Sequence, residues 1–184
     1  SYWQKYFGSN RTKMKGNNAY QPKLLDIIHN PDKRLRQKST EIDQEHLLKA
    51  DFKRLVLDMI LTMLQKDGAG LAAPQIGKNI RLIVVRKDFE KNEVIVMINP
   101  KITKKSWAKV VEEEGCLSVV DAQGNIIYGL VERPKKINCT YIDLLGNKQK
   151  LEANELLARA IQHETDHLDG ILFIDRLYEK KKKN

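Results

Sequence analysis

"QHETDH", residues 162–167, is the stretch from which the rest of the chain is best interpreted, because it places His163 and His167 four residues apart. On a helix this H-E-x-x-H spacing puts both imidazoles on one face, where they reach one metal ion, and Glu164 lies beside them as a base for water. Such a short pattern also recurs by chance. The competing interpretation is a charged patch on a surface helix.

The residues around this stretch follow a helical period from 153 to 168. Steps of three and four group them into two neighbouring stripes: Leu156, Ala160, His163 and His167 in one, and Leu157, Ile161, Glu164 and Leu168 in the other. A carboxylate between Ile161 and Leu168 is costly to bury unless it is paired or used in chemistry. The pattern therefore predicts that both histidines and Glu164 lie on buried faces, and it favours a functional site over a surface patch.

A second amphipathic helix is predicted near the N-terminus. Apolar residues recur in steps of three and four between Gln44 and Lys66, and the helix is expected to open near Asp43 and to close at Gly68. Its apolar stripe is Leu48, Phe52, Leu55, Met59 and Met63. This stripe is predicted to face the core.

The middle of the chain is strand-like. Segments with the composition of strands are residues 80–85, 93–99, 108–114, 126–132 and 137–153, the last a hairpin that turns near Gly146 and Asn147. Few long helical patterns separate these segments, so antiparallel pairing is favoured over a parallel array. The predicted fold class is α+β, with antiparallel sheets packed around the H-E-x-x-H helix.

Length, cysteine content and charge limit the class of protein. At 184 residues the chain fits one domain, which lies between an irregular N-terminal extension at 1–22 and a basic tail at 179–184. No apolar run approaches the ~20 residues of a membrane span, and two cysteines favour a reducing compartment. The net charge of +9 suits a transient ribosome contact. It predicts no specific nucleic-acid partner, because no aromatic-interleaved RNA signature accompanies it.

A catalytic metal site needs a third protein ligand and an open position for water. Phe173 stands where the longer metzincin pattern requires a histidine, which excludes that class. The remaining candidates are His29, His46, Cys116 and Cys139. Cys116 lies in "EEEGCLS", a Gly-Cys turn between strands, whereas Cys139 lies inside the strand pattern "INCTY" and is predicted to be a small core residue.

Three motifs together carry a family resemblance. "GAGLAAPQIG" at 68–77, "EGCLS" at 114–118 and "QHETDHLDG" at 162–170, in this order and spacing, resemble the signature motifs of peptide deformylase. The likeness extends over residues 23–178. It implies a hydrolase of protein biosynthesis that removes the N-formyl group from the initiator methionine of newly made polypeptides and releases formate. The implied partners are N-formylmethionyl nascent peptides.

The resemblance also implies roles for individual residues. It implies that Cys116, His163 and His167 hold one divalent metal, typically Fe(II), with Zn, Ni or Co as alternatives, and that Glu164 is the general base and acid. It implies that the Gln75 side chain and the Leu117 backbone N–H stabilise the oxyanion. The backbone of Gly68–Gly70 is expected to pair with the peptide, and the expected substrate-binding residues and pocket walls are Gly70, Ala69, Leu156 and Ala160.

The chain departs from the family pattern after the second motif. Val120 stands where a proline is usual, "DAQGNIIYGLVERP" is longer than the common form, and Arg133 is the nearest basic candidate for an arginine that the family carries there. The substrate-entry loop is therefore expected to differ in geometry, whereas the ligands and the base are not.

Two alternative functions and one question of location stay open at this level. The alternatives are a zinc endopeptidase, and a basic ribosome- or RNA-binding module with a structural zinc closed by a fourth ligand. Lysine outnumbers arginine 24 to 9, and the chain begins with Ser1 rather than Met. These features favour an organellar enzyme, of a plastid such as an apicoplast or of a mitochondrion, over a bacterial cytoplasmic one.

Overall fold

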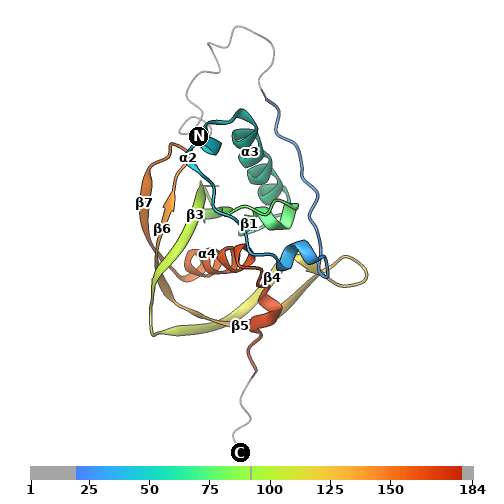
Figure 1. Cartoon of the computed structure of the whole chain (residues 1–184). Coiled ribbons are helices and arrows are strands. Elements are labelled where there is room, and N and C mark those ends of the chain that lie inside the picture. Colours follow the sequence, from blue (N-terminus) through green and yellow to red (C-terminus); the bar gives the residue numbers. More distant parts are fainter. Residues whose placement is uncertain (1–19, 92, 180–184) are drawn as a thin grey trace, which may run out of the picture.

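The computed structural model describes residues 20–91 and 93–179, and its strands form two antiparallel sheets (Figure 1). The larger sheet has the order β1-β2-β3-β6-β7, and β4 pairs with β5 in the smaller one. The strands are β1 Gly70–Ala72, β2 Leu82–Asp88, β3 Glu93–Lys105, β4 Lys109–Val120, β5 Ile126–Pro134, β6 Lys136–Ile142 and β7 Lys148–Asn154. The helices are α2 Gln44–Leu48, α3 Ala50–Gln65 and α4 Glu155–Leu168, with short 3-10 helices η2 Lys33–Arg36, η3 Ala73–Ile76 and η4 Phe173–Arg176.

Helices α3 and α4 pack on opposite faces of the five-stranded sheet. Strand side chains alternate between the two faces. Val84 of β2 therefore belongs to the apolar cluster that contains Met59 of α3, whereas its neighbour Ile83 belongs to the cluster that contains Ile161 of α4. Helix α4 is thereby held between the large sheet and the β4–β5 hairpin, in the centre of the molecule (Figure 1).

The predicted strands are confirmed, and so is the α+β class. The hairpin turns where expected, with Gly146 at φ 83° and its N–H donating to the Asp143 carbonyl. The chain also pairs Gly70–Ala72 with β2, so the Gly-rich segment that was expected to pair with peptide is itself the terminal strand of the large sheet. None of the described helices is long and apolar enough to cross a membrane.

The domain ends are only partly covered by the structure. Of the proposed extension at 1–22, residues 1–19 lie outside the described part of the chain, as do residues 180–184 of the proposed tail. Within the extension, the Tyr20 hydroxyl donates to the Asp58 carboxylate of α3 over 2.8 Å.

The prediction of one helix from Asp43 to Gly68 is wrong at its start. Lys49 has an extended backbone, with ψ 134°, which ends α2 and begins α3. The interruption shifts the helical phase by one residue, so Leu47 is buried and Leu48, predicted to face the core, is 78% exposed. The rest of the predicted stripe is buried or partly buried against the sheet. Periodicity alone did not reveal the break, because both pieces are helical.

Replacing Leu47 with alanine is expected to reduce the free energy of unfolding by about 2–5 kcal/mol, because Leu47 is only 4% exposed and its removal leaves a cavity. The adjacent Leu48→Ala is the matched control, with an expected change within about 0.5 kcal/mol. Urea unfolding of both variants measures the difference. A larger loss in Leu48→Ala than in Leu47→Ala would contradict the break at Lys49.

Candidate active site

Three potential metal ligands converge between β4 and α4. The donor atoms of Cys116, His163 and His167 all lie within 4.8 Å of one another, and the Cys116 Sγ is 3.2 Å from the His167 Nε2. The helical spacing places the two rings edge to face, with centroids 5.1 Å apart. One thiolate and two imidazoles at these separations form a donor set that suits Zn²⁺, Fe(II) or a similar divalent ion.

The other candidate ligands lie elsewhere. Cys139 is 1% exposed on β6 and packs in the cluster between α4 and the large sheet, which confirms the prediction of a core residue. His29 is exposed, and His46 packs edge to face on Phe52. Phe173, at the position of the third histidine in the metzincin pattern, stacks on the His163 ring at a centroid distance of 6.2 Å.

Glu164 is buried beside this group without a hydrogen-bond partner for one of its oxygens. Its side chain is 4% exposed, and no described residue bonds its Oε2. Burial raises the pKa of Glu164 to about 7, against the opposing charge of His163. A carboxyl group with a pKa near neutrality exchanges protons readily at physiological pH, as a general base or acid must.

Gly70 allows this position of Glu164. A Cβ added to Gly70 would lie 2.6 Å from the Glu164 Cγ and 2.7 Å from its Oε1. Any side chain on β1 at this point would therefore displace the carboxylate. The sequence implied a different use for Gly70, in pairing with peptide, and gave no sign of its contact with Glu164.

Replacing Gly70 with alanine is expected to lower kcat for the formate release that the family resemblance implies by about 100-fold, because misplacing a catalytic group by about 1 Å has an effect of this size. Bound metal per chain is expected to stay unchanged, since the substitution touches none of the three potential ligands. Gly146→Ala is the control for lost stability, because an added Cβ there meets nothing within 4 Å but its φ of 83° strains the distant turn. An unchanged kcat in Gly70→Ala would show that Glu164 does not need its observed position.

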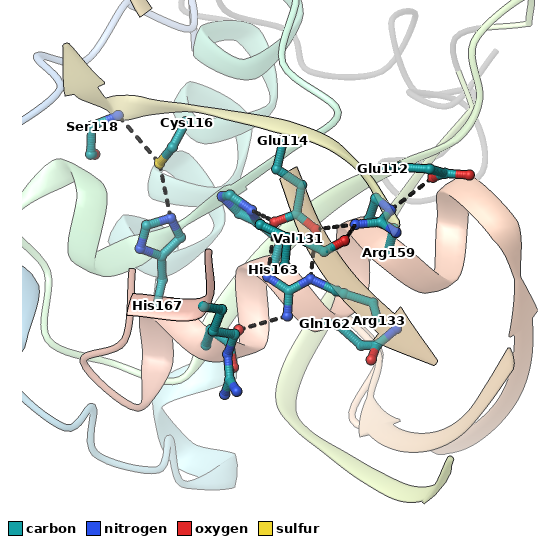
Figure 2. A network of polar contacts seen from close by, with 12 residues as sticks. Glu112, Glu114, Cys116, Ser118, Val131, Arg133, Arg159, Gln162, His163 and His167 are labelled. Atoms are coloured by element: carbon teal, nitrogen blue, oxygen red, sulfur yellow. Dashed lines mark hydrogen bonds and ion pairs between the residues drawn. The ribbon is translucent and has the colours of Figure 1, made fainter. Parts of the chain in front are cut away.

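Glu114 orients the His163 ring through the ring nitrogen Nδ1. Its Oε2 is 2.9 Å from the His163 Nδ1, and its two oxygens accept hydrogen bonds from Arg133 over 2.6 and 2.9 Å. Arg159 donates to the same carboxylate over 2.6 Å. Figure 2 shows this network connecting β4, β5 and α4. A carboxylate that holds Nδ1–H leaves Nε2 free as a ligand and fixes the direction of the ring.

Burial and neighbouring charges set the protonation states of Glu114 and His167. Burial alone would raise the pKa of Glu114, but hydrogen bonds from Arg133 and His163 outweigh it and hold the pKa well below its usual range. Burial also holds the pKa of His167 well below its usual value, which leaves the ring neutral, the form that binds a metal. Arg133, the basic residue picked out after the second motif, is 4% exposed and also pairs with Asp166 over 2.7 Å. It therefore supports Glu114 rather than reaching toward solvent.

Glu114 and Arg159 were missed as functional residues in the sequence. Glu114 appeared only as a letter of the motifs "EEEGCLS" and "EGCLS", with no role of its own, and Arg159 lies on α4 next to the predicted histidine stripe. The available signal was a glutamate in the second motif and an arginine beside the histidine stripe, both in segments expected to face the interior. Charged residues in such places are rarely buried unless they are paired. Their pairing across 45 residues was not visible in either segment alone.

Gln75 lies on η3, and both the oxygen and the nitrogen of its side-chain amide form hydrogen bonds. Its Oε1 accepts from the Ala72 N–H over 2.8 Å, and its Nε2 donates to the Ser118 Oγ over 3.2 Å. The same nitrogen is 3.5 Å from the Cys116 Sγ, at the edge of the metal group. Leu117 lies in the part of β4 between Gly115 and Val120 where the ladder with β5 is interrupted.

A pocket of about 160 Å³ opens beside these groups. It is lined by residues of β1 and the segment before it, of η3, of β4 and of α4, which include Ala69, Gly70, Gln75, Cys116, Leu117, Leu156, Ala160, His163 and Glu164. The structure thus brings the predicted catalytic and substrate-binding residues to one place, with His167 behind them. Leu156 is 51% exposed and forms the rim, so its stripe is buried only from Ala160 onward.

Comparisons with known proteins agree on one family. The family model "Polypeptide deformylase" matches residues 24–183. The chain is 46% identical over 161 residues to a peptide deformylase of Rhizobium meliloti (strain 1021), covering 86% of this chain and 88% of that one. Over 159 residues it is 45% identical to a peptide deformylase of Stenotrophomonas maltophilia (strain R551-3), covering 86% and 90%.

Solved structures give the same match. A Met-Ala-Ser-bound crystal structure of a class I type b peptide deformylase from Acinetobacter baumannii is similar with a TM-score of 0.77 and 32% identity, covering 85% of this chain and 100% of that one. A probable peptide deformylase from Synechococcus phage S-SSM7 has a TM-score of 0.75 and 44% identity, covering 83% and 99%.

Proposed function

The chain belongs to the peptide deformylase family, metal-dependent hydrolases that remove the N-formyl group from nascent polypeptides, and on this premise we propose a role for each residue of the site. The family assignment decides against the two alternatives, a zinc endopeptidase and an RNA-binding module. The observation that carries the proposed roles is the convergence of Cys116, His163 and His167 beside the unpartnered Oε2 of Glu164.

Cys116, His163 and His167 are the ligands of one divalent metal. The donor set fits such an ion, because three soft or borderline ligands lie within 4.8 Å and the described residues around them supply no fourth. Glu114 holds the His163 ring through Nδ1 and leaves Nε2 for the ion. When bound, the metal supplies Lewis acidity toward water and toward the formyl oxygen.

Glu164 moves the proton of the reaction. Its carboxylate accepts a proton from the water whose oxygen attacks the formyl carbon, and then gives that proton to the departing nitrogen as the C–N bond breaks. The products are formate and a free amine. The absence of a hydrogen-bond partner at Oε2 supports this role. A buried carboxylate oxygen rarely lacks a hydrogen-bond donor, and the unpartnered Oε2 is free to accept one from the attacking water.

Gln75 and Leu117 stabilise the negative oxygen that develops on the formyl carbon. The Gln75 amide is held by Ala72 and Ser118, so its N–H groups need little reorganisation during the reaction. The backbone N–H of Leu117, in the interrupted part of the β4–β5 ladder, is the second donor.

The pocket receives the methionine side chain. Its walls are Gly70 and Ala69 from the β1 side and Leu156 and Ala160 from α4. An unbranched thioether fits a small pocket with apolar walls. A Met-Ala-Ser peptide is bound in the Acinetobacter baumannii relative, which supports a peptide that begins with methionine.

Fe(II) is the metal proposed for the cell, with Zn, Ni or Co as substitutes that the same ligands accept.

The working location is proposed to be the matrix of an organelle, with bacterial cytoplasm as the alternative, although the relatives named above come from bacteria and a phage. The excess of 24 lysines over 9 arginines supports the organelle. Immunolocalisation in the source cells tests this location, and a signal throughout a bacterial cytoplasm would reject it.

A transient ribosome contact is proposed on the basis of the net charge of +9 and is tested by co-sedimentation with ribosomes.

Formate release from formyl-Met-Ala-Ser tests the proposed assignments. The protein is stripped of metal, reconstituted anaerobically with Fe(II) or with Zn(II), and assayed for formate and for bound metal per chain. We expect release with both metals, faster with Fe(II), and a fall of the Fe(II) rate after exposure to air. Equal rates with both metals and no effect of air would reject Fe(II) as the preferred ion.

A further inference from the structure

Helix α3 ends in a turn that leads directly into one wall of the substrate pocket. The Gly68 N–H donates to the Met63 carbonyl over 2.9 Å, and Asp67, just before Gly68, has a left-handed backbone with φ 51°. Residues other than glycine adopt this conformation at a cost, so the turn depends on contacts that hold it. Gly68, Ala69 and Gly70 line the pocket immediately after the turn. The position of this wall is therefore tied to the way the turn is fixed.

Arg86 of β2 holds the turn at three points. Its Nη1 donates to the Asp67 carboxylate over 3.0 Å, and its Nη2 donates to the Leu64 carbonyl of α3 over 3.4 Å. Its backbone N–H donates to the Ala69 carbonyl over 2.9 Å. The guanidinium carbon also lies 5.1 Å from the centre of the Phe89 ring. One residue thus connects the end of α3, the turn and the pocket wall.

Stability alone accounts poorly for an arginine at this position. Arg86 is 8% exposed, and its Nε–H has no hydrogen-bond partner among the described residues. The Asp67 side chain is 89% exposed, so water competes for the ion pair and the pair contributes little to folding. A methionine of similar length would fill the same space without burying a charge. The segment that Arg86 holds explains its contacts better than folding does.

That segment is the one expected to pair with the peptide. β1 is the terminal strand of the large sheet, and among the described strands only β2 pairs with it, along one edge. A peptide that binds as an added strand uses the other edge. Its apparent affinity falls in proportion to the fraction of molecules in which that edge has the binding geometry.

We propose that Arg86 is a positioning residue that keeps residues 67–70 in the geometry in which the free edge of β1 binds the peptide. Arg86 does not touch the substrate in this role. It fixes the turn before the peptide arrives, so that ordering the segment does not weaken binding. The proposal rests on the proposed deformylase activity and adds to it a residue that lies outside the pocket.

Steady-state kinetics with formyl-Met-Ala-Ser test this role. We expect Arg86→Met to raise KM about tenfold and to leave kcat within about twofold, as when the competent fraction falls to about a tenth. Arg86→Lys should give an intermediate KM, because an ammonium group lacks the fixed fork with which a guanidinium bonds Asp67 and the Leu64 carbonyl together. Asp67→Asn should raise KM by about two- to threefold and add nothing further to Arg86→Met in the double variant, because the two residues form one contact.

Arg81→Met is the matched control. Arg81 makes the same two kinds of contact at the end of α4, with the Asp169 carboxylate over 2.8 Å and with the Leu168 carbonyl over 3.4 Å. Neither contact involves residues 67–70. We therefore expect Arg81→Met to leave KM unchanged, although it removes a comparable arginine.

Amide hydrogen exchange gives a readout that does not depend on activity. We expect the amides of residues 68–70 to exchange at least about tenfold faster in Arg86→Met than in the parent, and at the parent rate in Arg81→Met. An unchanged KM in Arg86→Met, a loss confined to kcat, or an equal rise of KM in Arg81→Met overturns the positioning role. So does unchanged exchange in residues 68–70, whether or not the protein releases formate. No formate release from the parent with any metal overturns the proposed activity instead.

Discussion

Replacing Glu164 with glutamine is expected to reduce kcat for formate release by about 10²–10⁴-fold, the usual contribution of a general acid–base group. Glutamine keeps the shape of the side chain and its place against Gly70, where the glutamate Oε1 lies 2.7 Å from the position of an added Cβ. It lacks the ability to accept a proton from water and return it to the departing nitrogen. The loss should therefore appear in kcat, with KM changed little.

The amount of bound metal per chain distinguishes a role of Glu164 in proton transfer from a role as a metal ligand. We expect Glu164→Gln to retain one metal per chain, because the proposed ligands are Cys116, His163 and His167. The control is Glu132→Gln, an exposed carboxylate on β5 paired with Lys109, with unchanged kcat and metal. If Glu164→Gln keeps more than a tenth of the parent kcat, the carboxylate is not the base of this reaction.

Replacing Cys116 with alanine is expected to weaken metal binding by more than about 100-fold, since even outer partners of a metal site contribute 10–100-fold. Two imidazoles remain, and the thiolate that completes the donor set is lost. Formate release should fall with the metal content rather than independently of it. Competition with a coloured chelator measures the affinity, and elemental analysis measures the metal per chain.

Cys139 provides the matched control for Cys116. Both are buried, at 3% and 1% exposed, but Cys139 packs among apolar side chains, where burial raises its pKa to about 11 and keeps it a thiol. Cys139→Ala should retain metal and activity and lose some stability. Tight metal binding in Cys116→Ala, at one ion per chain, would remove the cysteine from the ligand set.

Much of the fold followed from short-range patterns in the sequence. The strand segments, the hairpin turn at Gly146 and the helix that carries His163 and His167 were each predicted from residues within about ten positions of one another. Local patterns suffice for such elements, because backbone geometry and side-chain alternation act over a few residues. The error at Lys49 has the same origin, since a single extended residue between two helical pieces leaves the apolar spacing almost intact.

The sequence by itself determined that His163 and His167 share one face of a helix with Glu164 near them, because an i, i+4 spacing has one geometric outcome on a helix. It did not determine what lies opposite that face. Cys116 meets His167 across 51 residues, and Glu114 meets His163 across 49. These contacts exist because α4 packs between the large sheet and the β4–β5 hairpin, which only the tertiary structure decided. Gly70 approaches Glu164 for the same reason, since the absence of a side chain becomes meaningful only once its neighbour is in place.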